Sequence, residues 1–129
     1  MSFNAALINT YFEKTFTLDT GVARVWTFQS PPYATTINAL DYASDSGATG
    51  THTLIATLVV NSDTRITGAA LTSNDTVTHN TAADSGKSLV VPPDATMSIT
   101  LSSGGTIGNV LGICVSLKMS AIQHYPQGS

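Results

Sequence analysis

The side chains that most often bind metals are few in this sequence and far apart. Its three histidines, His52, His79 and His124, show neither a His-x-His nor a His-Glu-x-x-His spacing. Zinc sites require ligands at such matched spacings, because one short element must direct two of them at the same ion. The sequence therefore predicts no metal site, and no other motif indicates a cofactor.

The nearest approach to a cation site is an acidic turn at residues 41–47. This segment reads Asp-Tyr-Ala-Ser-Asp-Ser-Gly and supplies the carboxylates of Asp41 and Asp45 ahead of Gly47. A calcium loop needs oxygen ligands at alternating positions and a later bidentate glutamate, whereas Glu13 is the only glutamate in the chain. We interpret the segment as a solvated turn whose Asp and Ser side chains bond to the nearby backbone.

No group of residues predicts catalysis. The Gly-x-Ser-x-Gly elbow of many hydrolases is absent, and the acidic residues are spread over turns, so they favour no carboxylate pair. Cys114 lies between Ile113 and Val115, a setting typical of a small packed residue, whereas a reactive thiol needs an exposed electropositive one. We expect Cys114 to be shielded and the protein not to be an enzyme.

Aromatic residues supply one candidate binding site. Tyr33 and Tyr42 flank a predicted strand at 34–40 and form a candidate glycan platform, since exposed tyrosines are common at interfaces. Trp26 and Phe28 share one face of another predicted strand, and a large aromatic pair in such a position is more typical of a core.

Composition excludes several classes of partner. The chain has 129 residues, a formal net charge of −3 and only five basic residues, which are scattered, so we expect no nucleic-acid binding. No run reaches the ~18 apolar residues of a membrane helix, and no basic segment precedes an apolar N-terminal stretch as in a secretory signal. A single cysteine excludes an internal disulfide. These features predict a cytoplasmic protein, or one assembled in the cytoplasm.

Alternation of apolar and polar residues is the main structural signal. From Leu111 to Met119 the apolar residues fall on one side at period two, and from Gly112 to Lys118 the small or polar residues fall on the other. Residues 96–101 alternate in the same way, and Gly104-Gly105 lies between the two runs, so we predict an antiparallel hairpin.

Further short strands are predicted between turn signals, which recur every ~8–12 residues as in sandwiches and jelly rolls. We expect a hairpin around residues 19–21 and a polar loop at 41–51. The sequence thus predicts an all-β, single antiparallel β-sandwich, jelly-roll-like, with about eight short strands. The domain is expected at 13–121 and a C-terminal tail at 122–129. Residues 1–12 are expected to form an N-terminal arm, with a short helix as the alternative. The other predicted strands are 13–18, 22–28, 34–40, 52–60, 65–72, 76–79 and 88–91.

Two sets of residues are predicted to contact partners. The small side chains of Gly112, Cys114 and Ser116 share one face of a strand and would let another sheet or a second subunit approach closely. The arm carries apolar side chains that are costly to leave in water, yet it precedes the first convincing strand. We therefore expect a partner to cover them: Phe3, Leu7, Ile8, Tyr11 and Phe12.

The chain resembles capsid decoration, or cement, proteins of tailed bacteriophages, of jelly-roll type. The likeness lies in a charge-poor, Thr- and Ser-rich all-β chain with an N-terminal arm and the stretch Leu89-Val-Val-Pro-Pro-Asp-Ala-Thr-Met-Ser-Ile-Thr-Leu101. The resemblance implies a homo-oligomer, commonly a trimer, that binds the major capsid protein in the virion without catalysis. A small carbohydrate- or receptor-binding β-sandwich module is the main alternative, and a jelly-roll enzyme is a third.

Overall fold

A computed structural model describes residues 11–103 and 107–122. They form nine β-strands and one short 3₁₀ turn, and no helix among them is long and apolar enough to cross a membrane. The elements are β1 (Tyr11–Thr20), β2 (Arg24–Gln29), β3 (Thr35–Ser46), β4 (Ile55–Val60), β5 (Asp63–Thr67), β6 (Thr78–Asn80), β7 (Val90–Val91), β8 (Thr96–Ser102), η1 (Ile107–Asn109) and β9 (Leu111–Ala121).

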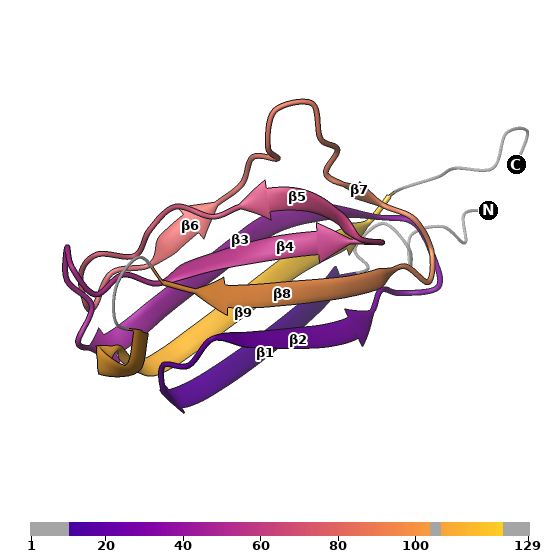
Figure 1. Ribbon diagram of the computed structural model, residues 1–129. Coiled ribbons are helices and arrows are strands. Elements are labelled where there is room, and N and C mark those ends of the chain that lie inside the picture. Colours follow the sequence, from indigo (N-terminus) through magenta and orange to yellow (C-terminus); the bar gives the residue numbers. More distant parts are fainter. Residues whose placement is uncertain (1–10, 104–106, 123–129) are drawn as a thin grey trace, which may run out of the picture.

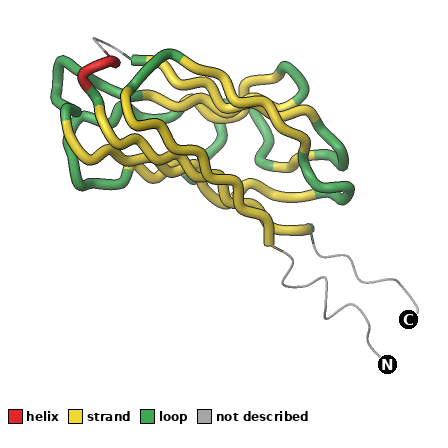
Figure 2. The backbone as a smooth tube through the Cα atoms, turned by 90° about the horizontal axis from the view of Figure 1, so that it is seen from below, coloured by secondary structure: helices red, strands yellow, loops and turns green. Residues whose placement is uncertain are grey.

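The strands form two antiparallel sheets that pack face to face (Figures 1 and 2). One sheet has the order β1-β9-β3-β6, with β7 also paired to β3, and the other has the order β2-β8-β4-β5. Successive strands thus cross repeatedly from one sheet to the other, as in a jelly roll. The predicted all-β sandwich of jelly-roll type is confirmed.

Both predicted hairpins are wrong in their pairing. β1 and β2 follow each other in the chain, but β1 pairs with β9 and β2 pairs with β8. β8 and β9 are likewise in different sheets. The intervening turns carry the chain across the sandwich instead of back along the same sheet. A local hairpin does form between β4 and β5, where Asn61 and Ser62 both have positive φ as a two-residue type I′ turn requires.

Two predicted boundaries also change. β3 extends to Ser46, so Asp41 and Asp45 belong to a strand and not to a solvated loop. β1 begins at Tyr11, and Tyr11 and Phe12 pair with Ser120 and Met119 of β9. The strand takes in these two residues because their alternation continues that of Lys14, Phe16 and Leu18. The rest of the expected arm lies outside the described residues.

The core lies between the two sheets and consists of the inward-facing side chains of their strands. Leu40 faces Leu117 across β3 and β9, and Leu58 faces Ile99 across β4 and β8; all four are fully buried. Further fully buried side chains come from both sheets and the loops: Tyr42, Leu54, Ile66, Leu71, Met97, Leu101, Ile113 and Met119.

The two open sides of the sandwich differ in how much of the chain covers them. On one side, residues 81–90 bridge the sheets: Asp84 accepts bonds from the Thr67 amide and hydroxyl at 2.8 and 2.7 Å, and Arg65 donates to the carbonyls of Ser88 and Val90 at 2.8 Å each. On the other side lie β1 and β2, the end strands of their sheets (Figure 1). No other described strand pairs with either of them on that side.

Candidate interaction face

The outer face of the β1-β9-β3-β6 sheet carries the residues that the sequence singled out on β9. Strand register aligns them in rows across the sheet: Ser116 stands between Thr15 and Asp41, and Cys114 stands between Thr17 and Ala43. The four-stranded sheet packs against the opposite side. We call this surface the candidate face.

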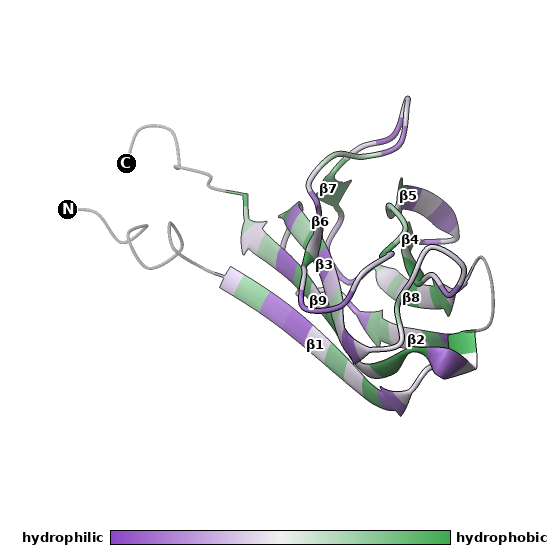
Figure 3. Ribbon diagram, turned by 90° about the vertical axis from the view of Figure 1, so that its left-hand side faces the viewer, coloured by the Kyte–Doolittle hydropathy of each residue, from purple (hydrophilic) through white to green (hydrophobic). Residues whose placement is uncertain are grey.

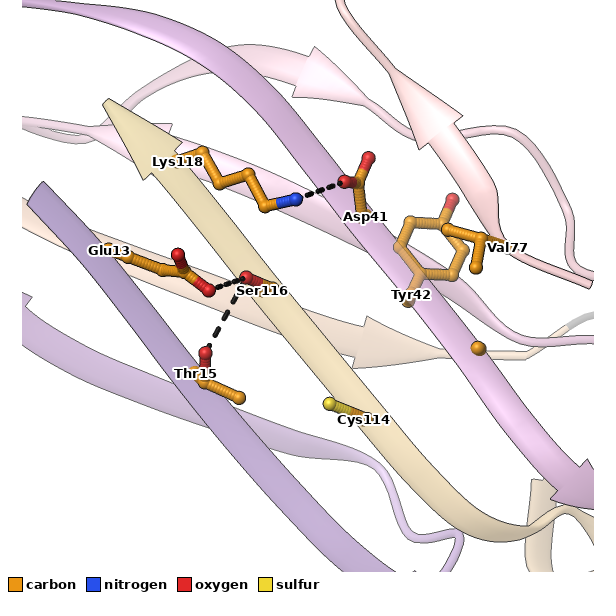
Figure 4. A pocket seen from close by; sticks show the side chains of 9 residues that line it. Glu13, Thr15, Asp41, Tyr42, Val77, Cys114, Ser116 and Lys118 are labelled. Carbon is orange, nitrogen blue, oxygen red and sulfur yellow. Dashed lines mark hydrogen bonds and ion pairs between the residues drawn. The ribbon is translucent and has the colours of Figure 1, made fainter. Parts of the chain in front are cut away.

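The centre of the candidate face is hollowed (Figure 4). The hollow has a volume of about 300 Å³. Its floor consists of the small residues Cys114, Ala43 and Ser116, and longer side chains such as Glu13 and Lys118 form its rim. The lining residues are Glu13, Thr15, Asp41, Tyr42, Ala43, Val77, Cys114, Ser116 and Lys118.

Asp41 organises the charges at one end of the hollow. His79 Nδ1 lies 2.5 Å from Asp41 Oδ1, and Lys118 Nζ lies 3.4 Å from Asp41 Oδ2. The hydrogen bond and the charge of Asp41 raise the pKa of the Lys118 ammonium above its usual range. Asp41 is buried beneath these two partners, which also connect three strands because they come from β6 and β9.

A second polar group lies along β1. The Ser116 hydroxyl donates to Glu13 Oε2 at 3.1 Å, and the Thr15 hydroxyl donates to Ser116 at 3.5 Å (Figure 4). The polar atoms of the face are therefore mostly engaged with one another. Among residues 11–103 and 107–122, no three His, Cys, Asp or Glu side chains are placed to hold a metal ion.

The small residues predicted on β9 lie together, and of the two coverings expected for them, another sheet or a second subunit, the structure excludes the second sheet of the same domain. Gly112, Cys114 and Ser116 all lie on the outer side of β9, so the second sheet of the same domain does not cover them. The expectation that Cys114 is packed is wrong for the single chain, because its thiol is exposed. Gly112 has φ +62°, and the side chain of Asp45 occupies the space where a Cβ would stand.

The candidate glycan platform is not formed. Tyr42 is only 1% exposed, because it pairs with Val115 on the inner side of the sheet and its hydroxyl donates to the Ala69 carbonyl. Tyr33 is half-buried at the far end of the strand, before Thr35. Phe12 faces inward and packs against the core, whereas Tyr11 is exposed. The predicted partner residues Phe3, Leu7 and Ile8, and the third histidine, His124, lie outside the described residues.

Comparison with known proteins adds likeness of fold alone. No family model matches the chain, and no curated protein matches its sequence. Similar solved structures include the sugar-binding C-terminal domain of EclA, with a TM-score of 0.48, 8% identity, and coverage of 84% of this chain and 79% of that one. Another is the VP2 subviral particle of infectious bursal disease virus, with a TM-score of 0.40, 18% identity, and coverage of 92% of this chain and 31% of the viral one. A third is the Gx strain of that virus, with a TM-score of 0.43 and 18% identity over 92% and 31% of the two chains. At these scores the likeness carries no functional conclusion.

Sequence reasoning missed the pairing of Asp41 with His79 and Lys118. These residues are far apart in the chain and meet only through the register of three strands. Within residues 40–46, period two puts the side chain of Asp41 on the other face of the strand from Leu40 and Tyr42, and that alternation was the available signal.

Proposed function

We propose that this β-sandwich is a non-enzymatic structural protein of a virion, namely a capsid decoration protein that binds and stabilises the capsid shell through the candidate face. The observation that carries the proposal is the hollow on that face. A central strand lined with small side chains leaves space for a protruding side chain of another protein, and no other described element fills it.

The chemistry of the face supports protein docking. Its acidic, cationic and hydroxyl groups already bond to one another, so a partner can cover them without leaving buried polar groups unpaired. An apolar partner side chain that entered the hollow would gain about 1.5–3 kcal/mol from burial. With only 10% charged residues in the chain, attachment would rest on buried area and hydrogen bonds, and we expect it to depend little on salt.

The resemblance to decoration proteins supplies the identity of the partner. Under this proposal the shell partner is the major capsid protein, the location is the virion and the chain is a homo-oligomer, most simply a trimer. Light scattering behind a sizing column tests the last point: a single species at the monomer mass of 13.4 kDa would contradict it.

Co-sedimentation tests the proposal directly. The purified chain is mixed with empty shells assembled from the major capsid protein of the same genome, and we expect saturable binding. The Cys114→Trp variant fills the hollow and should bind at least tenfold more weakly. Thr27→Trp is the matched control, because it adds the same bulk to an exposed position on the outer side of the other sheet. Absence of binding by the unmodified chain, or equal loss in both variants, would contradict the proposal.

A small carbohydrate-binding module is the second candidate. The hollow is as large as the smallest ligand pockets, and Glu13 and Asp41 offer acceptors for sugar hydroxyls. It lacks an aromatic platform, because Tyr42 is buried. A glycan array with the full chain decides between the two: saturable binding of one sugar that is abolished by Asp41→Ala, with no shell binding, would favour the module.

A further inference from the structure

Two of the five cationic side chains differ from the others. Arg65 and Lys87 bond to Asp63 at 2.8 and 2.6 Å, and Lys118 bonds to Asp41. Among the described residues, Lys14 and Arg24 have no such carboxylate partner. Instead, each lies over aromatic rings.

The rings and cations form one cluster, which we call the aromatic edge: Lys14, Phe16, Arg24, Trp26 and Phe28. Phe16 stacks on Trp26 with ring centroids 4.8 Å apart, and it lies 5.6 Å from Phe28. Lys14 Nζ lies 6.0 Å from the Phe16 ring and 5.9 Å from the Phe28 ring, and the Arg24 guanidinium lies 5.9 Å from the Trp26 ring. These distances are at the outer limit of a cation–π contact, about 6 Å, so the cations are held loosely.

The alternation of side chains along β1 and β2 explains why Lys14 and Arg24 lie beside the aromatic rings. On β2, Arg24, Trp26 and Phe28 pair with buried residues of β8 and therefore face inward. On β1, Lys14 and Phe16 face inward in the same way, opposite Leu117 and Val115. Figure 3 shows β1 along one side of the molecule, with hydrophilic and hydrophobic residues alternating along it. The inner sides of both end strands thus meet along one side of the sandwich, where the described chain bridges the two sheets only at one end, through residues 21–23.

The aromatic edge is consequently half open to solvent. Phe16, Trp26 and Phe28 pack against the core but are only partly buried. β1 has ten residues, and β9 is the only described strand that pairs with it. Its other side presents backbone donors and acceptors that an added strand can satisfy. Trp and Arg are also the residue types most enriched among those that dominate binding energy at interfaces.

We propose that the aromatic edge binds an extended, acidic segment of a partner protein, which adds as a strand to β1. Its carboxylates would approach Lys14 and Arg24, and its apolar side chains would cover Trp26 and Phe28. The charges are complementary to an acidic partner. The chain as a whole has a net charge of −3, yet this edge carries two cations, and within the described part of the chain no carboxylate pairs with them.

A second copy of the chain does not supply such a segment. Side chains on the inner side of one strand stay on the inner side of an added strand, and the inward residues of β1 and β2 include no acidic residue. Residues 1–10 and 123–129 contain no Asp or Glu either. An inward lysine on an end strand is moreover a known means of discouraging self-pairing. The occupant is therefore a different protein.

This inference goes beyond the proposed function, because the aromatic edge and the candidate face are separate surfaces and the edge needs no capsid. Its test uses the full chain and synthetic peptides, so failure of shell binding and failure of peptide binding are independent results.

Trp26 makes the test direct, because it is the only tryptophan in the chain and its fluorescence reports on the aromatic edge. The probe is a capped ten-residue peptide in which Glu and Leu alternate along one face and Thr fills the other. We expect a saturable change in Trp26 emission that weakens with added salt. The same peptide with Gln in place of Glu should bind at least tenfold more weakly, and the version with Lys should not bind.

Charge variants complete the design. Lys14→Gln and Arg24→Gln should each lower the affinity for the Glu peptide about three- to tenfold, whereas Lys87→Gln, which removes a cation bonded to Asp63, should leave it unchanged. Circular dichroism checks that each variant is folded. If Lys14→Gln does not fold, the affinity of the Arg24→Gln variant alone tests the proposal. Equal binding of the three peptides, no change in emission up to millimolar peptide, or equal effects of all three variants would overturn the proposal. An anionic oligosaccharide that shifts the emission when the Glu peptide does not would overturn it as well.

Discussion

Replacement of Thr35 by valine should stabilise the protein. Thr35 is fully buried at the start of β3, and its hydroxyl has no hydrogen-bond partner among the described residues. An unsatisfied buried polar group costs about 1–3 kcal/mol, and valine has nearly the shape of threonine without the hydroxyl. We expect Thr35→Val to raise the free energy of unfolding by about 1 kcal/mol, the lower end of that range.

Urea denaturation followed by circular dichroism measures this change, with the slope of the transition expected to stay constant. In a chain of this size the melting temperature should rise by roughly 3–5 °C. Thr36→Val is the matched control: Thr36 is the next residue, is partly exposed and faces the other side of the sheet, so its replacement should change stability by less than about 0.5 kcal/mol. If Thr35→Val destabilises the chain, or if both variants stabilise it equally, the buried hydroxyl is not the unsatisfied group inferred here.

Three further perturbations test other contacts. Tyr42→Phe removes the hydroxyl that donates to the Ala69 carbonyl and should cost about 1 kcal/mol in a urea titration. Hydrogen bonds from Thr67 hold the pKa of the Asp84 carboxyl below its usual 3.8. Ionised Asp84 therefore stabilises the fold above pH 3.8, and this contribution is lost as the pH falls through the lower pKa of the folded state. Urea titrations between pH 5 and pH 2.5 should show a smaller loss of stability for Asp84→Asn than for the unmodified chain. The exposed Cys114 thiol should react with a maleimide in the native monomer as fast as a free thiol within about tenfold, and bound shells should slow that reaction if the candidate face is the docking surface.

The strands themselves were largely predictable, and their partners were not. Period two identifies residues 96–101 and 111–119 as strands because alternation is a local property of the sequence. Their assignment to one hairpin failed because a turn that returns along one sheet and a turn that crosses to the other sheet use the same residue types, glycine among them. Only the hydrophobic inner faces of all strands together, with Leu117 facing Leu40 and Ile99 facing Leu58, determine which strands are neighbours.

The dependence of contacts on strand pairing also explains which residues of the candidate face could be predicted from the sequence. Gly112, Cys114 and Ser116 could be grouped from the sequence because they lie two residues apart on one strand. Asp41 and His79 could not, because 38 positions separate them and their contact depends on the pairing of β3 with β6. The predicted loop after residue 40 leaves Tyr42 at the surface, but β3 continues to Ser46, and alternation along this strand places the Tyr42 ring inside.

β1 connects the two proposed surfaces. Its outward residues Glu13 and Thr15 line the hollow of the candidate face, and its inward residues Lys14 and Phe16 form part of the aromatic edge. Because neighbouring residues of a strand point to opposite sides, a partner at one surface need not displace a partner at the other. A strand added to β1 would instead extend the sheet that carries the candidate face and leave the Ser116 bond to Glu13 in place. The fold thus allows one protein to be held at its sheet edge while another docks on its face, which is the geometry that a protein bridging neighbouring subunits requires.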